Sequence, residues 1–428
     1  MDYVIIGNGI AGISAANHIR RRDGKARITL VSKESDNFFA RTELMRVFCG
    51  QMTTRDIQPY ERRHYERMGF NRVRDEVIGL DHQNRQLDLK GGPSIYYDRL
   101  LIASGSAPRM AGCPGEDLDG VGTFVTWQDL EWMRERAKTA QKACVVGGGL
   151  IGVEVAEILL GAGIDISFII REDYYWPSAL DRTEGALVVE HIKRQGCDVR
   201  INTEGEEILG RNGKVIGLRT NHGETVDCDM VVCTIGLRPQ TDWLRDSGLE
   251  LDDSGGVVVD RHLRTSLQDV FAAGGCTTRV RSNRVRRSEQ LWHTSRDQGR
   301  VAGMNMAGAN QEYKRATFFN SARFFDIPYT TAGHVSFNVE GEHNWFQHEP
   351  GTNRTQRITF LPDGMVIGFN MLGRRWDHRA LIDWIDQEEH IDYVLAHLHE
   401  AVSDDESIPA FKVFQPLTSA GKDAAGRK

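Results

Sequence analysis

An apolar run, a glycine-rich stretch and a segment with helical spacing follow one another at the start of the chain. Residues 2–6 are mostly apolar, residues 7–12 are Gly-Asn-Gly-Ile-Ala-Gly, and the apolar positions of residues 13–19 recur at helical spacing. A second apolar run follows at residues 27–31. This order predicts a strand, a tight turn, a helix and a second strand.

The same order returns about 140 residues further along the chain. Residues 143–146 are apolar, residues 147–152 are Gly-Gly-Gly-Leu-Ile-Gly, residues 153–159 have helical spacing, and residues 165–170 form another apolar run. One such stretch is weak evidence, but two copies in the same context are hard to explain as unrelated loops. The pattern therefore predicts two βαβ units.

Each glycine of such a turn has a physical task. The first makes the tight turn, the second lets the backbone approach a pyrophosphate, and the third lets the helix pack closely on the strand. The N-terminus of the helix then offers free N–H groups to the phosphates. The spacing predicts two dinucleotide sites, at Gly7, Gly9, Ile10, Ala11 and Gly12 and at Gly147, Gly149, Ile151 and Gly152.

The C-terminal third of the chain has a different pattern. Short apolar runs at residues 318–325, 357–361 and 365–369 surround a Pro-Asp-Gly turn, which predicts an antiparallel sheet. Helices are expected at residues 380–389 and 391–402.

Composition narrows the class of protein. The 428 residues are 40% hydrophobic and 26% charged, which is typical of a folded soluble chain, and the net charge of −7 argues against general nucleic-acid binding. No apolar run approaches the roughly 18 to 20 residues of a membrane helix. No basic leader precedes the first strand, and the seven cysteines are odd in number and scattered. These features predict a cytoplasmic protein with reduced thiols. No set of metal ligands is expected.

Three further segments carry a resemblance to a known family. Residues 97–109, Tyr-Asp-Arg-Leu-Leu-Ile-Ala-Ser-Gly-Ser-Ala-Pro-Arg, resemble the YDxLxxATGSxP segment of two-dinucleotide flavoprotein reductases. Residues 229–239 are similar to the segment that closes the nicotinamide domain, and residues 265–276 to the late flavin segment, usually TSxxxIYAAGD. With the two glycine stretches, the chain resembles the FAD-dependent pyridine nucleotide-disulfide oxidoreductase superfamily.

This resemblance implies an α/β fold with two Rossmann-like three-layer domains and a C-terminal α+β domain. A discontinuous FAD-binding domain is expected at residues 1–111 and 236–312, and an NAD(P)H-binding domain at residues 112–235. Residues 313–428 are expected to form an interface domain, which leaves a homodimer open.

Many members of the superfamily carry a redox-active CxxxxC pair beside the flavin, on the first helix after the second strand, and this chain has no such pair there. Residues 37–46 instead resemble the PYxRPPLSK segment of the rubredoxin, ferredoxin and apoptosis-inducing-factor-like branch, and Cys49 is expected to be structural. The branch implies hydride transfer from NAD(P)H to FAD, then electron transfer to a small redox protein such as a rubredoxin or ferredoxin. Two alternatives stay open: an NADH oxidase that uses oxygen, and an apoptosis-inducing-factor-like flavoprotein with a signalling or docking role.

The resemblance also implies roles for individual residues at the junction of the two nucleotides. Arg46 takes the place of a lysine that pairs with the glutamate after the second glycine stretch, here Glu154. The pair is expected to present the nicotinamide to the flavin. His293 is a candidate for proton handling, although a packing role for its ring is the stronger alternative.

Two positions of the flavin site depart from the family pattern. Gly275 replaces the aspartate that contacts the ribityl chain. Ser32 replaces the ribose-binding acid, and Glu34, two residues later, is the favoured substitute. Other flavin and nucleotide contacts are expected at Arg41, Ala103, Ser104, Gly105, Gly236, Gly274 and Trp292.

The nicotinamide specificity signals conflict. Arg171 would suit the 2′-phosphate of NADPH, whereas Glu172 would accept from the 2′-hydroxyl of NADH. NADH is slightly favoured, because a second basic residue is missing.

Finally, five arginines stand among the nine residues from Arg279 to Arg287. Such a run usually forms a solvated loop, and the alternative is a docking patch for a small acidic electron carrier.

Overall fold

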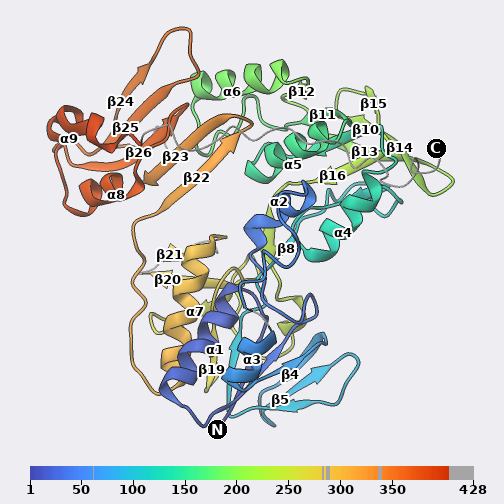
Figure 1. Cartoon of the computed structure of the whole chain (residues 1–428), viewed down its shortest axis with the longest axis vertical. Helices are drawn as coiled ribbons and strands as arrows, with labels where there is room; N and C mark the ends of the chain where they lie inside the picture. The colour runs from blue at the N-terminus through green and yellow to red at the C-terminus, as the bar shows by residue number, and fades with distance from the viewer. Residues whose placement is uncertain (61, 282–283, 286–289, 336–339, 404–428) are drawn as a thin grey trace, which may run out of the picture. The chain divides into compact units, whose positions relative to one another are not determined.

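The computed structural model describes residues 1–60, 62–281, 284–285, 290–335 and 340–403 (Figure 1). The chain folds into two compact units, each assembled from separate parts of the sequence. Unit 1 comprises Met1–Arg109, Val125–Glu131 and Gly236–Arg315, and unit 2 comprises Met110–Phe124, Trp132–Ile235 and the described part of Ala316–Lys428.

Unit 1 is built on a five-stranded parallel sheet in the order β19-β7-β1-β2-β3. Apart from the edge strand β3, its strands are mostly apolar and buried, as expected for a parallel sheet that is covered on both faces. They are β1 (Asp2–Ile6), β2 (Arg27–Val31), β3 (Phe70–Val73), β7 (Arg99–Ile102) and β19 (Val270–Ala272).

Two helices of unit 1, α1 (Ile10–Arg22) and α7 (Trp292–Met306), run side by side (Figure 1). Gly299 and Gly303 make this possible. A Cβ at Gly303 would lie 2.5 Å from the carbonyl oxygen of Ala15, and one at Gly299 would overlap the backbone of Ala11. A larger residue at either place would push the helices apart.

Smaller elements complete unit 1. They are the sheet β4 (Val77–Asp81), β5 (Gln86–Leu89) and β6 (Ile95–Tyr96), the pair β8 (Ser106–Pro108) and β17 (Leu237–Pro239), the sheet β18 (Val257–Val259), β20 (Thr277–Arg281) and β21 (Arg284–Val285), and the short helices η1 (Arg41–Glu43), α2 (Leu44–Phe48), α3 (Arg62–Met68) and η2 (Asp242–Leu244). Helix α4 (Trp127–Arg136) begins in the segment Val125–Glu131 of this unit.

Unit 2 repeats the same architecture. Its parallel sheet has the order β12-β11-β10-β16-β9. The elements are β9 (Val121–Gly122), β10 (Lys142–Val146), β11 (Asp165–Ile169), β12 (Asp198–Arg200), β16 (Met230–Cys233), the helices α5 (Leu150–Gly161) and α6 (Arg182–Arg194), and an antiparallel sheet of β13 (Gly205–Arg211), β14 (Lys214–Thr220) and β15 (Thr225–Asp227).

Unit 2 also contains the predicted C-terminal antiparallel sheet, in the order β22-β23-β26-β25-β24. Helix α8 packs on β23 and β26 of this sheet. The expected last helix is divided, because α9 ends at His397 and a 3-10 turn follows. The elements are β22 (Phe319–Phe324), β23 (Ile327–Gly333), β24 (His343–His348), β25 (Thr355–Phe360), β26 (Val366–Leu372), α8 (His378–Asp386), α9 (Ile391–His397) and η3 (Leu398–Ala401).

The predicted fold class is confirmed, with two Rossmann-like parallel-sheet units and a C-terminal antiparallel sheet that carries helices. The two units do not test the three predicted domain boundaries, which stay predictions. Among the described residues, no helix is long and apolar enough to span a membrane.

Candidate functional site

The first glycine turn, residues 7–12, follows the carboxyl end of β1. Gly7 has φ +104°, and a Cβ there would overlap the carbonyl oxygen of Ala103. At Gly12 a Cβ would overlap the carbonyl oxygen of Gly7, because the helix lies directly against the turn. Around Gly9, in contrast, the position of a Cβ has no atom within 4 Å. Two glycines are required by packing, and the middle one leaves open space.

The N-terminus of α1 faces this open space with uncapped N–H groups. Gly9 occupies the N-cap position without a side-chain hydrogen bond, and the first turn, which includes Ile10 and Ala11, holds no acidic side chain. The partial positive charge of this helix end is therefore available to an anion.

Two other segments reach the same edge of the sheet. Residues 103–105 follow β7, which pairs with β1, and residues 273–275 follow β19, which pairs with β7. A Cβ at Gly274 would lie 3.1 Å from the Cβ of Ala11. The predicted contacts at Ala103, Ser104, Gly105, Gly274 and Gly275 therefore gather beside the first glycine turn, at the carboxyl edge of the sheet where nucleotides bind in such folds.

The space beside Gly275 is filled by polar groups. Oε1 of Gln290 would lie 2.5 Å from a Cβ at Gly275, and the Ser106 hydroxyl would be closer still. The Gly275 carbonyl accepts hydrogen bonds of 3.1 Å from both Ser106 Oγ and Gln290 Nε2. An aspartate would not fit here unless both Ser106 and Gln290 moved.

After β2, the predicted ribose-binding acid Glu34 is paired with Arg41, another predicted cofactor contact. Both oxygens of Glu34 accept from Arg41, at 2.8 and 2.6 Å, and Oε1 also accepts from the Trp127 N–H at 2.9 Å. Burial alone would raise the pKa of Glu34, but these donors outweigh it and lower the pKa below its ordinary value. Ser32 accepts from the backbone N–H of Glu34 at 3.3 Å and so shapes the turn.

The start of α7 carries the two predicted aromatic neighbours of the flavin. Trp292 is 38% exposed, and the guanidinium of Arg296 lies 5.4 Å from the centre of its ring. His293 is half-buried. Further along α7, the buried Gln298 accepts from the Gly274 N–H at 2.7 Å, which fixes the helix to the late glycine segment.

The second glycine turn, residues 147–152, repeats the first. Gly147 has φ +120°, and a Cβ there would lie 2.7 Å from the Thr234 carbonyl. A Cβ at Gly152 would overlap the Gly147 carbonyl, whereas around Gly149 nothing lies within 4 Å. Helix α5, which includes Ile151 in its first turn, begins without a side-chain cap or an early acidic residue.

Helix α5 also carries Glu154, half-buried one turn into the helix. The pKa of Glu154 is raised to about 7. Burial is the largest cause, the neighbouring Glu157 also raises the pKa, and Arg323 lowers it. Arg323 comes from β22 and donates to Glu157 at 2.9 Å. The helix that follows the second turn therefore carries a carboxyl group that can lose or gain a proton near neutral pH.

The remaining predicted contacts have other partners. Arg171 and Glu172 pair with each other at 2.9 Å, at side-chain exposures of 70% and 31%. Gly236 has φ +104°, and its carbonyl accepts from the Arg109 N–H at 2.9 Å. Arg46 pairs with Glu43 at 3.2 Å. Arg46 belongs to unit 1 and Glu154 to unit 2, so their predicted ion pair stays a prediction.

The predicted arginine-rich patch lies partly outside the described residues. The structure shows the backbone of β20 and β21, which pair in antiparallel fashion, whereas residues 282–283 and 286–289 are not described.

Comparison with known proteins decides the family. A family model described as pyridine nucleotide-disulphide oxidoreductase matches residues 1–299, which is more than half of the 428 residues. The chain belongs to this family. The predictions of an oxidoreductase family and of FAD and NAD(P)H as cofactors are thereby confirmed at the level of the family.

Individual relatives cover the chain to different extents. The chain is 32% identical to a nitrite reductase [NAD(P)H] of Bacillus subtilis (strain 168) over 64% of its own length and 34% of that protein. It is 28% identical to a rubredoxin-NAD(+) reductase of Pseudomonas putida, over 64% of this chain and 72% of that protein. The chain thus spans only about a third of the first relative.

A solved structure supports the fold. The NAD-dependent persulfide reductase from A. fulgidus superposes with a TM-score of 0.84 at 24% identity, over 92% of this chain and 79% of that one. At this identity the likeness concerns the fold alone.

As a pyridine nucleotide-disulphide oxidoreductase, the chain departs from what the family's name suggests. All seven cysteines are free, and five of them are buried. Cys276, next to the late flavin segment, is fully buried, and burial raises the pKa of its thiol. Such a thiol stays protonated and is a poor nucleophile.

Both glycine turns fit the pyrophosphates of the family's cofactors. Each combines an open middle glycine with a helix N-terminus that lacks a side-chain cap and an acidic first turn. The donor set suits a dianion, because backbone N–H groups carry no competing negative charge.

Sequence patterns missed some of the residues that shape these sites. Gln290 fills the space beside Gly275, and the Tyr175 hydroxyl donates to the Gly149 carbonyl at 3.3 Å. Neither residue belongs to a glycine pattern or a family segment, so no local signal marked them.

Proposed function

We propose that this chain accepts hydride from NAD(P)H on FAD and passes the electrons to a small redox protein such as a rubredoxin or ferredoxin. The observation that carries this proposal is the pair of matching glycine turns, each with an open middle glycine, in a chain whose cysteines are all free. Two nucleotide sites provide a hydride path, and no cysteine pair stands on the first helix after the second strand, where such a pair would relay electrons from the flavin.

The residues around the first turn would hold FAD. The N–H groups of α1 would bind its pyrophosphate across Gly9, and the Glu34 carboxylate, oriented by Arg41, would accept from the adenosine ribose. When bound, FAD supplies the chemistry that takes up a hydride and releases electrons singly.

The residues around the second turn would hold NAD(P)H. The N–H groups of α5 would bind its pyrophosphate across Gly149. The Glu154 carboxylate would accept from the nicotinamide carboxamide, with Arg46 holding the carboxylate in place. Glu172 and the absence of a second basic residue favour NADH over NADPH. His293 would donate or accept a proton beside the flavin ring.

The rubredoxin-NAD(+) reductase relative supports a protein acceptor, because the chain covers 72% of its length. The five arginines between Arg279 and Arg287 add a second argument, since a run of positive charge in a chain of net charge −7 would attract an acidic carrier. We place the protein in the cytoplasm, where such carriers are reduced. The C-terminal domain at residues 313–428 would supply a dimer surface.

Rapid mixing tests the proposal. The FAD-loaded protein is reduced anaerobically with NADH or NADPH, and then mixed with rubredoxin, ferredoxin or oxygen while flavin absorbance is followed. We expect fast reduction, fast reoxidation by one carrier, slow reoxidation by air, and a carrier rate that falls as ionic strength rises. Faster reoxidation by oxygen than by any carrier would identify an NADH oxidase, and a long-lived complex with slow turnover would favour a docking role.

A further inference from the structure

A loop of unit 2 joins the second strand of the nucleotide fold to the next helix. It covers residues 171–181, between β11 and α6, and begins with Arg171 and Glu172. In a dinucleotide fold this segment follows the position of the ribose-binding side chain. The loop therefore begins where the adenosine end of a nucleotide would be held.

The C-terminal sheet packs aromatic rings against this loop. Phe324 of β22 lies edge-on to Tyr175, with ring centres 5.6 Å apart, and to Trp176 at 6.1 Å. Tyr329 of β23 lies edge-on to Trp176 at 5.6 Å. On its other side, Tyr175 contacts Phe168 of β11 at 6.3 Å. The loop is thus packed between the nucleotide sheet and the C-terminal sheet.

Tyr175 connects this packing to the second glycine turn. Its side chain is fully buried, and its hydroxyl donates to the Gly149 carbonyl at 3.3 Å. Gly149 is the open glycine across which a pyrophosphate would bind. A shift of Tyr175 would therefore shift the turn itself.

Trp176 indicates that the loop does not relax to its preferred backbone conformation. Its backbone φ is +51°, in a region that residues other than glycine rarely adopt. Such a conformation persists only when its surroundings hold it, and here the rings of Phe324 and Tyr329 provide the contacts.

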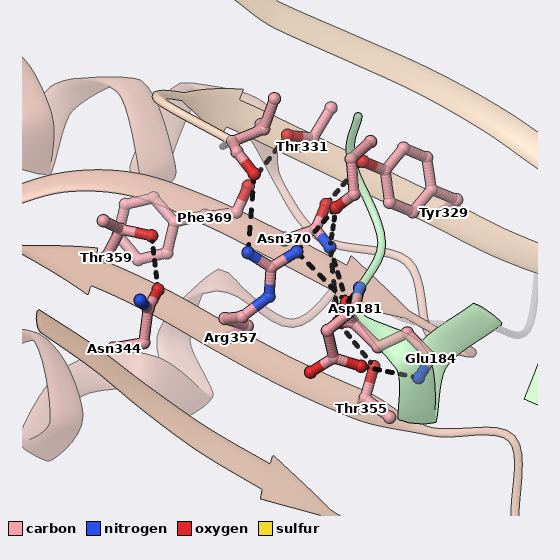
Figure 2. Close-up of polar contacts among 12 residues, drawn as sticks. Asp181, Glu184, Tyr329, Thr331, Asn344, Thr355, Arg357, Thr359, Phe369 and Asn370 are labelled. Carbon is pink, nitrogen blue, oxygen red and sulfur yellow. Dashed lines mark hydrogen bonds and ion pairs between the residues drawn. The ribbon is translucent and has the colours of Figure 1, made fainter. Parts of the chain in front are cut away.

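Polar groups of the C-terminal sheet hold the other end of the loop (Figure 2). The Ala179 carbonyl accepts from Arg357 at 2.6 Å and from Asn370 at 3.0 Å. Arg357 also donates to Glu184 at 3.1 Å, with side-chain exposures of only 3% and 0%. Thr355 donates to the same carboxylate at 3.2 Å.

Glu184 also begins helix α6. Its N–H donates to the Asp181 carboxylate at 2.8 Å, and its own carboxylate accepts from the Asp181 N–H at 3.0 Å, which forms a capping box. One buried carboxylate thus serves both the end of the loop and the C-terminal sheet (Figure 2).

We propose that the C-terminal sheet positions the loop 171–181 for nucleotide binding, with Tyr175 and Arg357 as the positioning residues that set the affinity for NAD(P)H. The proposal rests on the proposed function, because it assigns the second glycine turn to the nicotinamide nucleotide. It gives the C-terminal sheet a task besides forming the expected interface.

Two variants of the full-length, FAD-loaded protein test this. Tyr175→Phe keeps the ring and removes the hydroxyl that bonds Gly149. The double variant Arg357→Met, Glu184→Gln replaces the buried ion pair with neutral groups of similar size, which keeps a residue able to form the capping box and avoids an unpaired buried charge. Arg354→Met is the matched control, since Arg354 pairs with Glu349 at 40% side-chain exposure near the start of β25.

Rapid mixing with increasing NADH separates binding from chemistry, because the half-saturating concentration reports affinity and the limiting rate reports hydride transfer. We expect the half-saturating concentration to rise about 10-fold in both test variants, as for the loss of one hydrogen bond to a buried group. The limiting rate, the FAD content and the control variant are expected to stay within about 2-fold of the wild type.

An unchanged half-saturating concentration in Tyr175→Phe would overturn the proposal, even if the double variant unfolds at a lower temperature, because that result describes a merely structural contact. Failure of NADH and NADPH to reduce the wild-type flavin at all would instead overturn the proposed function, and the inference with it.

Discussion

The two glycine turns have the same backbone and different surroundings. At Gly7 and Gly147 the chain passes so close to a neighbouring carbonyl that only glycine fits, and at Gly9 and Gly149 the space is open. After the second strand, however, the first copy has Glu34 held by Arg41 at 22% side-chain exposure, whereas Glu172 pairs with the exposed Arg171.

This difference separates what the backbone dictates from what side chains can vary. The turn is repeated because its close approaches leave no alternative residue. The polar groups after the second strand are under no such constraint, so one copy has a rigid, preorganised acceptor and the other a solvated pair that can rearrange. The preorganised acceptor suits a nucleotide that stays bound, and the solvated pair suits a nucleotide that enters and leaves.

The largest effect is expected at the open glycines. Gly9→Ala should weaken FAD binding by about 100-fold, and Gly149→Ala should weaken NADH binding by about 100-fold. In each case the added methyl group occupies the position through which the pyrophosphate approaches the backbone. Since the methyl group meets no protein atom within 4 Å, the fold should be retained. Fluorescence titration and thermal melting check both, with the equally open Gly24→Ala as control. Equal losses of both nucleotides in either variant would contradict the assignment of one site to each turn.

A smaller effect concerns the protonation of Glu154. Its pKa rises from 4.5 when unfolded to about 7 when folded, so the native state holds an extra proton between these values. The stability from this proton is complete below pH 4.5 and is lost as the pH rises through about 7. The ionised carboxylate of Glu154 is the better hydrogen-bond acceptor for the nicotinamide carboxamide. The KM for NADH should therefore fall as the pH rises through about 7.

Steady-state measurements across pH 5 to 9 check this prediction. Glu154→Gln should give a KM that no longer changes near pH 7, about 10-fold above the wild-type plateau. Glu157→Gln should move the break to lower pH, because it removes a neighbouring negative charge. A wild-type profile without a break would show that this carboxyl does not contact the nucleotide.

The smallest effect is expected for the exposed pair. Arg171→Ala should lower kcat/KM for NADPH about 3-fold and leave NADH nearly unchanged, because a solvated guanidinium contributes little to binding. Comparing the two nucleotides in Arg171→Ala and in the control Lys193→Ala, on the surface of α6, measures this preference. A loss confined to NADH would reverse the expected roles of Arg171 and Glu172.

Local patterns predicted the fold and the glycine turns well. Strand, turn and helix each depend on neighbouring residues, so residues 2–31 and 143–170 were sufficient to predict both βαβ units. The Pro-Asp-Gly turn between β25 and β26 was predicted for the same reason.

Long-range partners were not predicted. Arg357 and Glu184 stand 173 residues apart, and nothing in the sequence around either marks the other. The pairing of Glu34 with Arg41 was missed although both were candidates, because the family segments suggest a ligand for each. Buried polar partners depend on how distant elements pack, and this information is absent from local periodicity.

The sheet of unit 1 has a consequence for how the chain is made. Its strand β7 ends at Ile102, and its neighbour β19 begins at Val270. At about 5 to 20 residues per second, ribosomes need roughly 10 to 30 seconds to make the intervening segment. Throughout that interval β7 pairs only with β1, so its other edge is open, and α1 lacks the contact with Gly299 and Gly303 of α7. The nascent chain must therefore keep four of the five strands of its first parallel sheet soluble while the whole parallel sheet of the second emerges.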